Sequence, residues 1–473
     1  MKPKIKKIRV HFMGLGGSGM TAVALLAKAA GYEVSGCDLS SSNYYVKTLL
    51  KKGIKLKIGH KVDHLKNVDI LTVSPAIFDL NLNHPEVVEA KKRKILMTWQ
   101  EFMGRFLQKG KFVIAIAGTH GKSTTTALMG LVLEKAGFDP SVEVGAIIPR
   151  WSKNVRIGSS KYFVCEADEF YYNFLNYSPS LAIINNIEMD HPEFFRDFEQ
   201  FKEAFKKFIK KIKGPKILVV NEESQGIRQL LIKMQKWLRK NKVKTIGYYF
   251  ENRFRFPFYK EYQGSITRTT SRFTYFEVMH NGINHNFKLK IAGSHNVYNA
   301  LGVIGAAREL NIGLNKIKKI FQSFNGLKRR FEMIGNIKGI KIFDDYGHHP
   351  TAIAATLDAV KNRFVKSRIW AIIEPHQISR LRLFMNEFAS ALNKADKVII
   401  TKTFLGREKN VKPINPLNLV KRIGINKAEY IEDFNQITGK IAKKAKKGDV
   451  VVVFGAGKSY LLSRQIKEKL KNL

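Results

Sequence analysis

The segment FVIAIAGTHGKST (residues 112–124) decides the fold of the middle of the chain. Its first part, Phe112–Ala117, is a short apolar and β-branched run, which predicts a buried strand. A loop with two glycines follows, and a helical pattern then continues from Lys122 to Ala136. A strand, a glycine-rich loop and a helix in this order are typical of a phosphate-binding loop in a mostly parallel α/β sheet.

The loop between that strand and that helix carries the groups that ATP requires. Its backbone N–H groups can cradle phosphate oxygens, Lys122 can neutralise the terminal phosphates, and the Ser123 hydroxyl can ligate Mg²⁺. It departs from the long phosphate-loop pattern, because Ile116 stands where that pattern has its first glycine. The predicted ATP site consists of Gly118, Thr119, His120, Gly121, Lys122, Ser123 and Thr124.

A second glycine-rich loop, GLGGSG (residues 14–19), follows a strand predicted at Ile8–Met13 and opens a predicted helix. Glycines let the backbone turn tightly and approach a pyrophosphate at the helix N-terminus. Asp38 follows the next strand about 20 residues on, where an acid can bind a ribose. The pattern leaves a dinucleotide and other nucleotide diphosphates open, and a turn that only packs helix on sheet is the alternative. The predicted contacts are Gly14, Gly16, Gly17, Ser18, Gly19 and Asp38.

A third loop, GAGKS (residues 455–459), follows a strand predicted at Asp449–Phe454. It too lacks the first glycine of the long pattern, with Val452 in that place. No nearby carboxylate or histidine cluster accompanies it in the sequence. We therefore interpret it as a turn at a sheet edge and not as a phosphate site.

Acidic residues follow two predicted strands of the middle part, Tyr162–Cys165 and Leu181–Asn185. The C-terminal ends of parallel strands face the ligand crevice of an open α/β sheet. Because Mg²⁺ prefers oxygen ligands, Glu166 together with Ser123 is a candidate metal site. His191 is a candidate ligand of a second metal ion; the alternative is a core histidine bonded to the backbone.

The segment FDDYGHHP (residues 343–350) is again a strand end that runs into a helix start. Its two acids and two histidines could bind ribose hydroxyls, orient an amine or transfer a proton. Arg330 upstream supplies charge for a phosphate, and Arg380 downstream could clamp a carboxylate. A solvated surface charge is the alternative for each arginine.

The length of 473 residues suggests about three domains, at roughly 150 residues each. Strands alternate with helices in the first, middle and last thirds, which indicates βαβ units, and antiparallel strands are expected within residues 248–289. We place the boundaries near residues 110 and 326. The predicted fold is therefore α/β, with domains 1–109, 110–325 and 326–473.

The chain has 82 Lys plus Arg against 39 Asp plus Glu, a formal net charge of +43. Such a charge usually suggests nucleic acid, an anionic membrane or an acidic substrate. The basic residues are scattered over the whole chain. The phenylalanines of the basic helix predicted at Phe198–Lys211 are spaced as the apolar face of an amphipathic helix rather than as a base-stacking platform. We expect no specific nucleic-acid partner.

Two cysteines in 473 residues exclude a disulfide framework and a four-cysteine zinc site. Cys37 and Cys165 end apolar runs and are expected to be buried thiols in a reducing cytosol. The sequence contains no run of about 18 apolar residues, so no membrane span is predicted. The basic and then apolar N-terminus runs straight into glycines, so it is interpreted as a first strand rather than a signal peptide. We expect a cytoplasmic protein without a membrane partner.

The ordered motifs resemble the Mur ligase family, the ATP-dependent amide ligases of peptidoglycan precursor synthesis, over essentially the whole chain. They are GTHGKST at residue 118, EADE at 166, NNIEMDH at 185, SHNVYNA at 294, RRF at 329 and DDYGHHPT at 344. The resemblance implies a Rossmann-like N-terminal domain that binds the UDP part of a substrate rather than NAD. It also implies a central P-loop ATPase-type domain and a C-terminal Rossmann-like domain that brings the amino acid.

The resemblance further implies roles for single residues. Lys122, His348 and Arg380 would be catalytic, Lys122 on the β- and γ-phosphates and the other two facing the incoming amino acid. Arg330 would reach a phosphate and Asp345 the ATP ribose. The remaining implied contacts are His295, Asn296 and Asn299 at the adenine, Ser123, Glu166 and His191 at metal, and Ser74 with the first glycine-rich loop at UDP. A plain helix N-terminus capped by Ser294 is compatible with the adenine role of the SHNVYN stretch.

Two branches of the family are compatible with the sequence. The GLGGSGM loop, DDYGHHPT and PHQISR (residues 375–380) are similar to the branch that joins L-alanine to UDP-N-acetylmuramate. The segments at 166–172 and 185–195 are similar to the branch that attaches the tripeptide L-Ala-γ-D-Glu-meso-diaminopimelate in cell-wall recycling. We favour L-alanine and keep the tripeptide as the alternative. The expected partners are ATP with Mg²⁺, UDP-N-acetylmuramate and L-alanine, in a monomer or homodimer.

Overall fold

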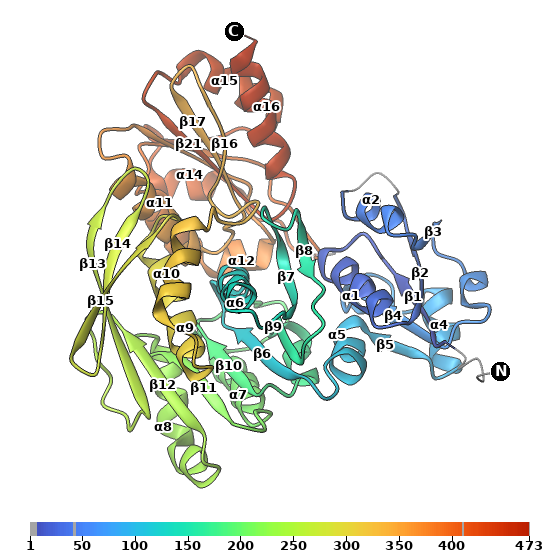
Figure 1. Ribbon diagram of the computed structural model, residues 1–473. Helices are drawn as coiled ribbons and strands as arrows, with labels where there is room; N and C mark the ends of the chain where they lie inside the picture. The colour runs from blue at the N-terminus through green and yellow to red at the C-terminus, as the bar shows by residue number, and fades with distance from the viewer. Residues whose placement is uncertain (1–6, 41–43, 409–410, 473) are drawn as a thin grey trace, which may run out of the picture.

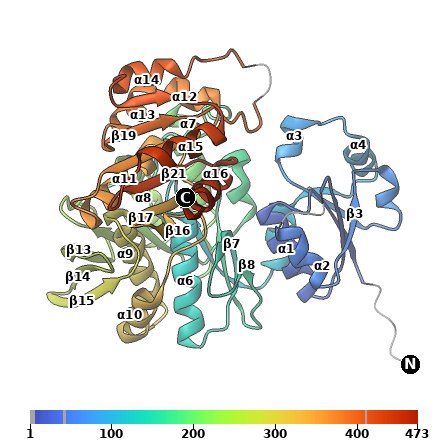
Figure 2. The same cartoon turned by 90° about the horizontal axis from the view of Figure 1, so that it is seen from above.

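The computed structural model describes residues 7–40, 44–408 and 411–472. Three β-sheets, each covered by helices, form three units in chain order, as the fold prediction requires. Figures 1 and 2 show the N-terminal unit on one side of the central unit and the C-terminal unit stacked above it. The strands of the three sheets come from residues 9–98, 112–289 and 332–454; the exact domain boundaries near 110 and 326 stay predictions.

The N-terminal sheet is fully parallel, in the order β3-β2-β1-β4-β5. Gly36 in β2 has no room for a side chain, because a Cβ there would lie 2.6 Å from the backbone oxygen of Phe12. This close approach lets β1 and β2 end together beneath the first glycine-rich loop. The elements are β1 Arg9–Met13, α1 Ser18–Ala29, β2 Glu33–Asp38, α2 Tyr44–Lys51, β3 Lys55–Ile58, η1 Val62–Leu65, β4 Ile70–Val73, α3 Ala76–Leu80, α4 Pro85–Lys92 and β5 Leu96–Thr98.

Residues 98–108 have a helical sequence pattern that predicts one helix, but the observed connection to the central unit is not a single helix. α5 (Trp99–Phe102) begins with a capping box between Thr98 and Glu101, and the chain then widens into a π-helical turn, η2 (Met103–Leu107). Such turns interrupt helices locally, so the observed connection is shorter and less regular than the pattern suggests.

The central sheet has ten strands, in the order β15-β14-β13-β12-β11-β10-β6-β9-β7-β8. Its inner strands are parallel, and antiparallel strands β14, β15 and β8 close its two ends. The antiparallel strands expected within 248–289 are therefore present. The strands are β6 Phe112–Ala117, β7 Ser141–Ile148, β8 Lys153–Arg156, β9 Tyr162–Glu166, β10 Leu181–Ile184, β11 Ile217–Asn221, β12 Lys244–Tyr249, β13 Lys260–Thr269, β14 Thr274–His280 and β15 Ile283–Leu289.

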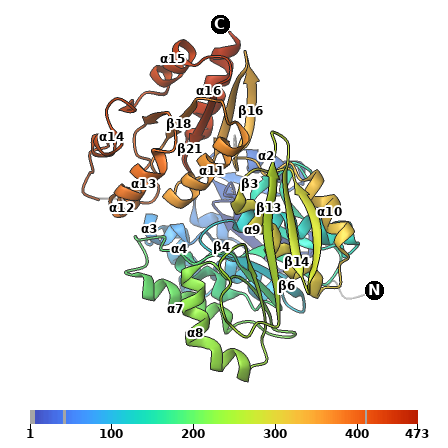
Figure 3. The ribbon, with the colours of Figure 1, turned by 90° about the vertical axis from the view of Figure 1, so that its left-hand side faces the viewer.

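Helices cover both faces of this sheet, and Figure 3 shows α7 and α8 on the face away from α9 and α10. α6 and α9 pack against each other and are buried along most of their length, so their apolar pattern is continuous rather than one-sided. In α7 the side chains of Phe201, Phe205 and Phe208 are fully buried, which confirms that they form the apolar face of that helix. The helices are α6 Lys122–Ala136, η3 Phe170–Asn176, α7 Phe198–Ile209, α8 Gln225–Lys240, α9 Ser294–Glu309 and α10 Leu314–Ser323.

The C-terminal sheet has the order β16-β17-β21-β18-β19-β20, parallel except for β16. β21 lies inside this sheet, so the expectation that the GAGKS loop is a turn at a sheet edge is wrong in that respect. The elements are β16 Glu332–Ile337, β17 Ile340–Asp345, α11 Pro350–Arg363, β18 Ile369–Ile373, α12 Ile378–Leu383, α13 Met385–Leu392, β19 Lys397–Ile400, α14 Leu417–Ile423, β20 Ala428–Tyr430, α15 Phe434–Lys444, β21 Val450–Phe454 and α16 Ser459–Lys471.

Two further predictions concern burial and helix ends. Cys37 and Cys165 are both free and buried, as expected. The N-cap position of α9 is Gly293, and the Ser294 side chain makes no capping hydrogen bond, so the expected Ser294 cap is wrong. Across the described ranges, no helix is long and apolar enough to cross a membrane.

Candidate active site

The predicted ATP loop lies between β6 and α6, at the C-terminal edge of the central sheet. Gly118 and Gly121 have φ values of +130° and +82°, which glycine adopts readily and other residues rarely adopt. A Cβ on Gly121 would also collide with the side chains of Asn299 and Asn185. Both glycines are therefore required for the shape of the loop.

Lys122, the first residue of α6, reaches back across this loop. Its Nζ donates to the Gly118 carbonyl at 2.7 Å and to both carboxylate oxygens of Glu169 at 3.1 and 3.0 Å. Burial acts to lower the pKa of the Lys122 ammonium, but the nearby charges of Glu169 and Asp168 outweigh it and raise that pKa. Lys122 is thus held as a cation under the loop. Glu169 lies in the predicted acidic segment, but no single role is predicted for it.

The segment after β10 fastens the loop from its other side. Asn186 Oδ1 accepts from the His120 backbone N–H at 2.8 Å, and Asn185 Nδ2 donates to the His120 carbonyl at 3.2 Å. The Thr119 hydroxyl donates to the Glu188 carbonyl at 2.8 Å. The strands β6 and β10 are neighbours in the sheet, so segments about 65 residues apart in sequence meet here.

Carboxylates and histidine surround the loop where metal was predicted. Ligand atoms of Asp168, Glu169 and His191 lie within 4.8 Å of one another. Glu166 is not in that cluster; its Oε1 accepts from the Gly145 backbone N–H at 2.5 Å. It lies beside buried Glu143, whose pKa is raised well above the usual value by burial and then by the charge of Glu166.

The C-terminal unit contributes arginine to the same site. Arg330 Nη2 lies 3.3 Å from the Ser123 hydroxyl oxygen, to which it donates. This contact joins residues 207 positions apart and places a positive charge directly above the loop. Asp345 lies nearby, but its two carboxylate oxygens accept from the backbone N–H groups of Phe331 and Gly347 at 2.8 and 2.6 Å. In this arrangement Asp345 shapes the strand end from which Arg330 approaches.

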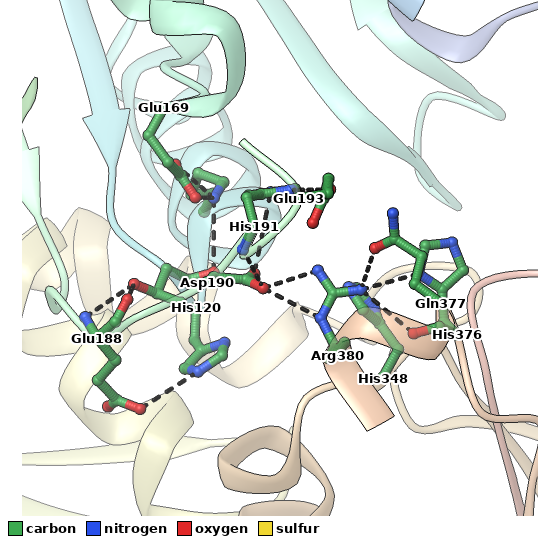
Figure 4. Close-up of polar contacts among 12 residues, drawn as sticks. His120, Glu169, Glu188, Asp190, His191, Glu193, His348, His376, Gln377 and Arg380 are labelled. Atoms are coloured by element: carbon green, nitrogen blue, oxygen red, sulfur yellow. Dashed lines mark hydrogen bonds and ion pairs between the residues drawn. The ribbon is translucent and has the colours of Figure 1, made fainter. Parts of the chain in front are cut away.

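Arg380 forms the central ion pair between the two units (Figure 4). Its Nη2 and Nε lie 2.7 and 3.1 Å from Asp190 Oδ1, and its side chain is fully buried. Nη1 donates to Gln377 Oε1 at 2.7 Å and reaches His376 Nδ1 at 2.9 Å. Burial acts to raise the pKa of Asp190, but the charges of His191 and Arg380 lower it well below its usual value. The sequence predicts a metal or ribose contact for Asp190 and not this ion pair, because nothing in its local sequence points to a partner 190 residues away.

Histidines from both units line the space next to this ion pair. The ring of His348 lies 5.2 Å from that of His376, centroid to centroid, and His348 Nδ1 contacts the Tyr346 carbonyl at 3.0 Å. Burial and the charge of Arg380 lower the pKa of His348 well below its usual value, and the pKa of His376 falls to about 4 for the same reasons. Both imidazoles are therefore neutral at neutral pH.

A second contact between the units lies at Glu188. Its Oε2 accepts from the Thr351 hydroxyl at 2.9 Å and lies 3.5 Å from His120 Nε2. His349, the N-cap of α11, places its ring 4.8 Å from that of His120. A cavity of about 370 Å³ opens beside these side chains, between the segment after β10 and the helices α11 and α13.

The predicted adenine residues lie at the N-terminus of α9, against the ATP loop. Asn299 Nδ2 donates to Asn296 Oδ1 at 3.2 Å, and Asn296 Nδ2 donates to the Ala292 carbonyl at 2.7 Å. His295 is partly buried, and loss of solvation lowers its pKa to about 4. The structure thus brings His295, Asn296 and Asn299 together with the loop, while their contact with adenine stays a prediction.

The first glycine-rich loop lies at the C-terminal ends of β1 and β2, beside the central unit. Asp38 Oδ2 accepts from the Gly16 backbone N–H at 2.8 Å, so the predicted ribose-binding acid touches the loop. Asn154 of β8 donates to the Ser18 carbonyl at 2.8 Å, which links this loop to the central sheet. Ser74, at the end of β4, accepts from the Ala76 backbone N–H at 3.4 Å.

The third loop, residues 455–459, is occupied by a side chain of the protein itself. Glu374 Oε2 accepts from the Ser459 backbone N–H at 3.0 Å, and a Cβ on Gly457 would lie 2.6 Å from the same oxygen. The Gly455 carbonyl accepts from Arg329 Nη2 at 2.7 Å. An internal carboxylate therefore takes the place that an anion would have, which agrees with the prediction that this is not a phosphate site.

Comparisons with known proteins match the chain in three consecutive parts. Residues 9–111 match the Mur ligase family catalytic domain, residues 116–307 the Mur ligase middle domain, and residues 329–457 the Mur ligase glutamate ligase domain. Together these matches cover most of the chain and contain the loop and acidic segments described above.

Full-length relatives agree with these matches. A UDP-N-acetylmuramate–L-alanine ligase of Caldicellulosiruptor saccharolyticus is 38% identical over 455 residues, 95% of this chain and 96% of that protein. The crystal structure of a UDP-N-acetylmuramate–alanine ligase from Thermotoga maritima superposes with a TM-score of 0.80 at 25% identity, over 98% and 99% of the two chains. A murein peptide ligase of Psychrobacter arcticus has the same fold, with a TM-score of 0.70 at 24% identity and the same coverage. The chain belongs to the Mur ligase family.

Proposed function

We propose that this protein is an ATP-dependent amide ligase that joins L-alanine to UDP-N-acetylmuramate and releases ADP and phosphate. The observation that carries the proposal is the position of Lys122, a partly buried cation between the Gly118 carbonyl and Glu169, with Arg330 of the C-terminal unit above Ser123. Positive charge thus faces the loop from two domains, where transferred phosphate would lie. The 38% identical relative is named for this same reaction. The reaction takes place in the cytoplasm, in a monomer or homodimer.

In the first step a carboxylate oxygen of the muramoyl group attacks the γ-phosphorus of ATP, and the bond to the β–γ bridging oxygen breaks. ADP leaves with that electron pair, and an acyl phosphate forms. Such transfers require positioning and charge neutralisation more than covalent help. Lys122 and Arg330 meet that need, and the backbone N–H groups at the N-terminus of α6 hold the phosphate oxygens.

In the second step the neutral amine of L-alanine attacks the acyl carbon, and phosphate leaves from a tetrahedral intermediate with the oxygen that came from the carboxylate. His348 is neutral and holds Nδ1 against the Tyr346 carbonyl, so Nε2 is free to accept a hydrogen bond from the amine. Arg380 acts mainly by holding the C-terminal domain against the central domain, through its ion pair with Asp190. Closure keeps water from the acyl phosphate, which water would otherwise destroy.

Mg²⁺ fits the acidic side of this site. Glu143 and Glu166 are adjacent carboxylates, and the raised pKa of buried Glu143 shows how unfavourable two negative charges are there without a cation. Ser123 and Glu166 would hold one Mg²⁺ and His191 a second metal ion, with Asp168 and Glu169 close to His191. When bound, Mg²⁺ supplies charge that offsets the phosphates of ATP.

The other predicted residues take the roles that their positions allow. The loop at Gly14, Gly16, Gly17, Ser18 and Gly19, with Asp38 and Ser74, holds the UDP part of the acceptor. His295, Asn296 and Asn299 line the adenine, and Asp345 lies at the ribose. These assignments give each domain one ligand: UDP-sugar, ATP and amino acid in chain order.

The decisive experiment compares two amine substrates with the same acceptor. Phosphate release from ATP is measured with UDP-N-acetylmuramate plus either L-alanine or the tripeptide L-Ala-γ-D-Glu-meso-diaminopimelate. We expect release that requires both UDP-N-acetylmuramate and L-alanine. Release only with the tripeptide would transfer the protein to the recycling branch, and release without any amine would refute ligation altogether.

A further inference from the structure

Four side chains with metal-ligand chemistry meet in the core of the N-terminal unit, away from the ATP loop. They come from four different elements: His11 from β1, Cys37 from β2, His64 from η1 and Glu86 from α4. All four are buried, and one ligand atom of each lies within 4.8 Å of the others. None of these residues has a role in the proposed reaction.

The distances between these atoms fit one small cation. Glu86 Oε1 lies 3.6 Å from His11 Nε2, 3.5 Å from His64 Nδ1 and 3.7 Å from Cys37 Sγ. A tetrahedral zinc site with bonds of about 2.0–2.3 Å has ligand atoms about 3.3–3.8 Å apart. The separations from Glu86 therefore equal the edges of such a tetrahedron, and are too long for hydrogen bonds between nitrogen and oxygen.

Two of the nitrogen atoms in this cluster are unsatisfied. Among the described residues, His11 Nε2 and His64 Nδ1 have no hydrogen-bond partner, although both are buried. The other nitrogen of His11, Nδ1, contacts the Ser35 hydroxyl at 2.9 Å. That contact fixes the ring and aims the Nε2 lone pair into the cluster, as the hydrogen-bond partner of a metal-bound histidine does. A buried polar atom without a partner costs free energy, so an unexplained pair of them indicates a ligand.

The charge states in the cluster also favour a cation. Burial and nearby positive charges lower the pKa of His11 to about 3, so its imidazole is neutral and able to bind metal. Burial raises the pKa of Glu86 to about 7, and burial together with the Glu86 charge raises that of the Cys37 thiol. A dry pocket with a thiol and a carboxyl is unfavourable for anions, and a divalent cation would reverse this.

We propose that His11 Nε2, Cys37 Sγ, His64 Nδ1 and a Glu86 oxygen form a closed, four-coordinate zinc site. Cys37 loses its thiol proton to solvent on binding and coordinates as thiolate. The mixed nitrogen, sulfur and oxygen set suits Zn²⁺ and excludes Mg²⁺, which takes oxygen ligands in octahedral geometry. His60 stands at the outer side, its Nδ1 3.0 Å from Cys37 Sγ.

The site is structural, because four protein ligands leave no open position. It joins β1, β2, η1 and α4 at the end of the sheet that carries the first glycine-rich loop. The Cys37 carbonyl accepts from the backbone N–H groups of Gly14 and Leu15 at 2.9 and 3.0 Å, so the metal would anchor the base of that loop. This proposal does not depend on the amide-ligase reaction.

The test uses the full chain, purified without chelator and held in excess Mg²⁺ to occupy the oxygen sites. Elemental analysis is expected to find about one zinc per chain. After replacement by Co²⁺, a thiolate-to-cobalt charge-transfer band is expected, because only a cysteine ligand produces it. The band should vanish in Cys37→Ser and fall in His64→Asn. It should persist in the control Cys165→Ser, whose cysteine accepts instead from Gln108 Nε2 at 3.3 Å.

A measurement on the wild-type chain gives a result that does not depend on whether the variants fold. Zinc titrated into chelator-treated protein should raise the melting temperature of the wild-type chain, since a ligand that binds only the folded state stabilises it. Less than about 0.1 zinc per chain, together with no thiolate band and no thermal shift, would overturn the proposal. A thiolate band unchanged in Cys37→Ser would equally overturn it.

Discussion

Two loops of this chain read Gly-Lys-Ser after a buried strand and before a helix, at residues 121–123 and 457–459. In the first, Lys122 turns back under the loop to the Gly118 carbonyl and to Glu169. In the second, Lys458 is exposed and the loop N–H groups face Glu374, an anion supplied by the protein. The same local sequence thus forms the predicted phosphate site in one sheet and, in the other, a loop that is filled by a carboxylate of the protein.

The two loops differ in the side chains that the neighbouring strands place beside them. The strand beside β6 ends in the acidic segment that holds Lys122, and the strand beside β21 ends in Glu374. Backbone N–H groups at a helix start favour an anion in either case. Whether that anion is a phosphate or a carboxylate depends on partners that are distant in sequence.

The largest difference between the two loops is expected when each lysine is removed in turn. Lys122→Ala should lower turnover about 1000-fold or more, because it removes the cation next to the transferred phosphate. The matched variant Lys458→Ala should stay within about twofold of wild type, as an exposed side chain away from chemistry. Initial rates of phosphate release, with circular dichroism to confirm folding, check both; equal losses would remove the distinction between the loops.

The next largest effect is expected at the ion pair that holds the C-terminal unit over the predicted ATP loop at residues 118–124. Arg380→Ala should reduce kcat/KM about 100-fold, because it leaves the Asp190 carboxylate buried without its partner and loosens domain closure. Arg382→Ala, on the same helix but exposed, is the control. A variant Arg380→Ala with wild-type kinetics would show that closure does not need this pair.

The filled loop should respond in stability rather than in activity. Glu374→Ala leaves the Ser459 backbone N–H buried without an acceptor and opens space beside Gly457. We expect a loss of about 2 kcal/mol in the free energy of unfolding, and a smaller loss for Glu374→Gln, which keeps an acceptor oxygen. Urea unfolding measures both variants, and unchanged stability would contradict the anchoring role of Glu374.

The smallest expected effect concerns Asp449, which precedes the strand leading to the filled loop. Arg368 Nη2 lies 2.6 Å and Trp370 Nε1 3.0 Å from its Oδ2. Burial acts to raise the pKa of Asp449, but these contacts outweigh it and lower that pKa. A lowered pKa stabilises the fold above the unfolded value of about 3.9 and ceases to do so as pH falls through the folded value.

Asp449→Asn should therefore cost about 1 kcal/mol of unfolding free energy at pH 7, and the difference from wild type should shrink below about pH 4. The control is Asp63→Asn, whose carboxylate is 81% exposed and should show no change. Thermal unfolding at several pH values follows both variants. A difference that grows toward acid pH would contradict the assigned ion pair.

Local sequence was sufficient for the features that are local in the structure. The strand at Phe112–Ala117, the helix from Lys122 and the buried faces of α7 follow from periodicity and glycine positions, and all are observed. The α/β class and the three sheets follow from the alternation of strands and helices. Not every element was predicted: the three-residue β5 and the π-helical turn η2 have patterns too brief to identify, and the long helix α8 was not predicted either.

Partners that are distant in sequence could not be predicted. Asp190 meets Arg380, Arg330 meets Ser123, and Glu374 enters the third loop only because the domains and strands are packed as they are. Cys37 is a buried thiol, as expected, yet its three ligand-type neighbours come from separate elements. The fold explains only a small part of the net charge of +43. Lys122 and Arg330 place two positive charges at the candidate active site, and the fold assigns no binding partner to most of the other basic residues.

The most direct test of the account follows one oxygen atom. UDP-N-acetylmuramate labelled with ¹⁸O in both carboxylate oxygens is incubated with enzyme, ATP, Mg²⁺ and L-alanine, and the released phosphate is analysed by mass spectrometry. If the carboxylate attacks the γ-phosphorus at the predicted ATP loop and the amine then displaces phosphate, each released phosphate carries one ¹⁸O. Phosphate without ¹⁸O would mean that water, and not the carboxylate, receives the phosphoryl group, and would contradict the account.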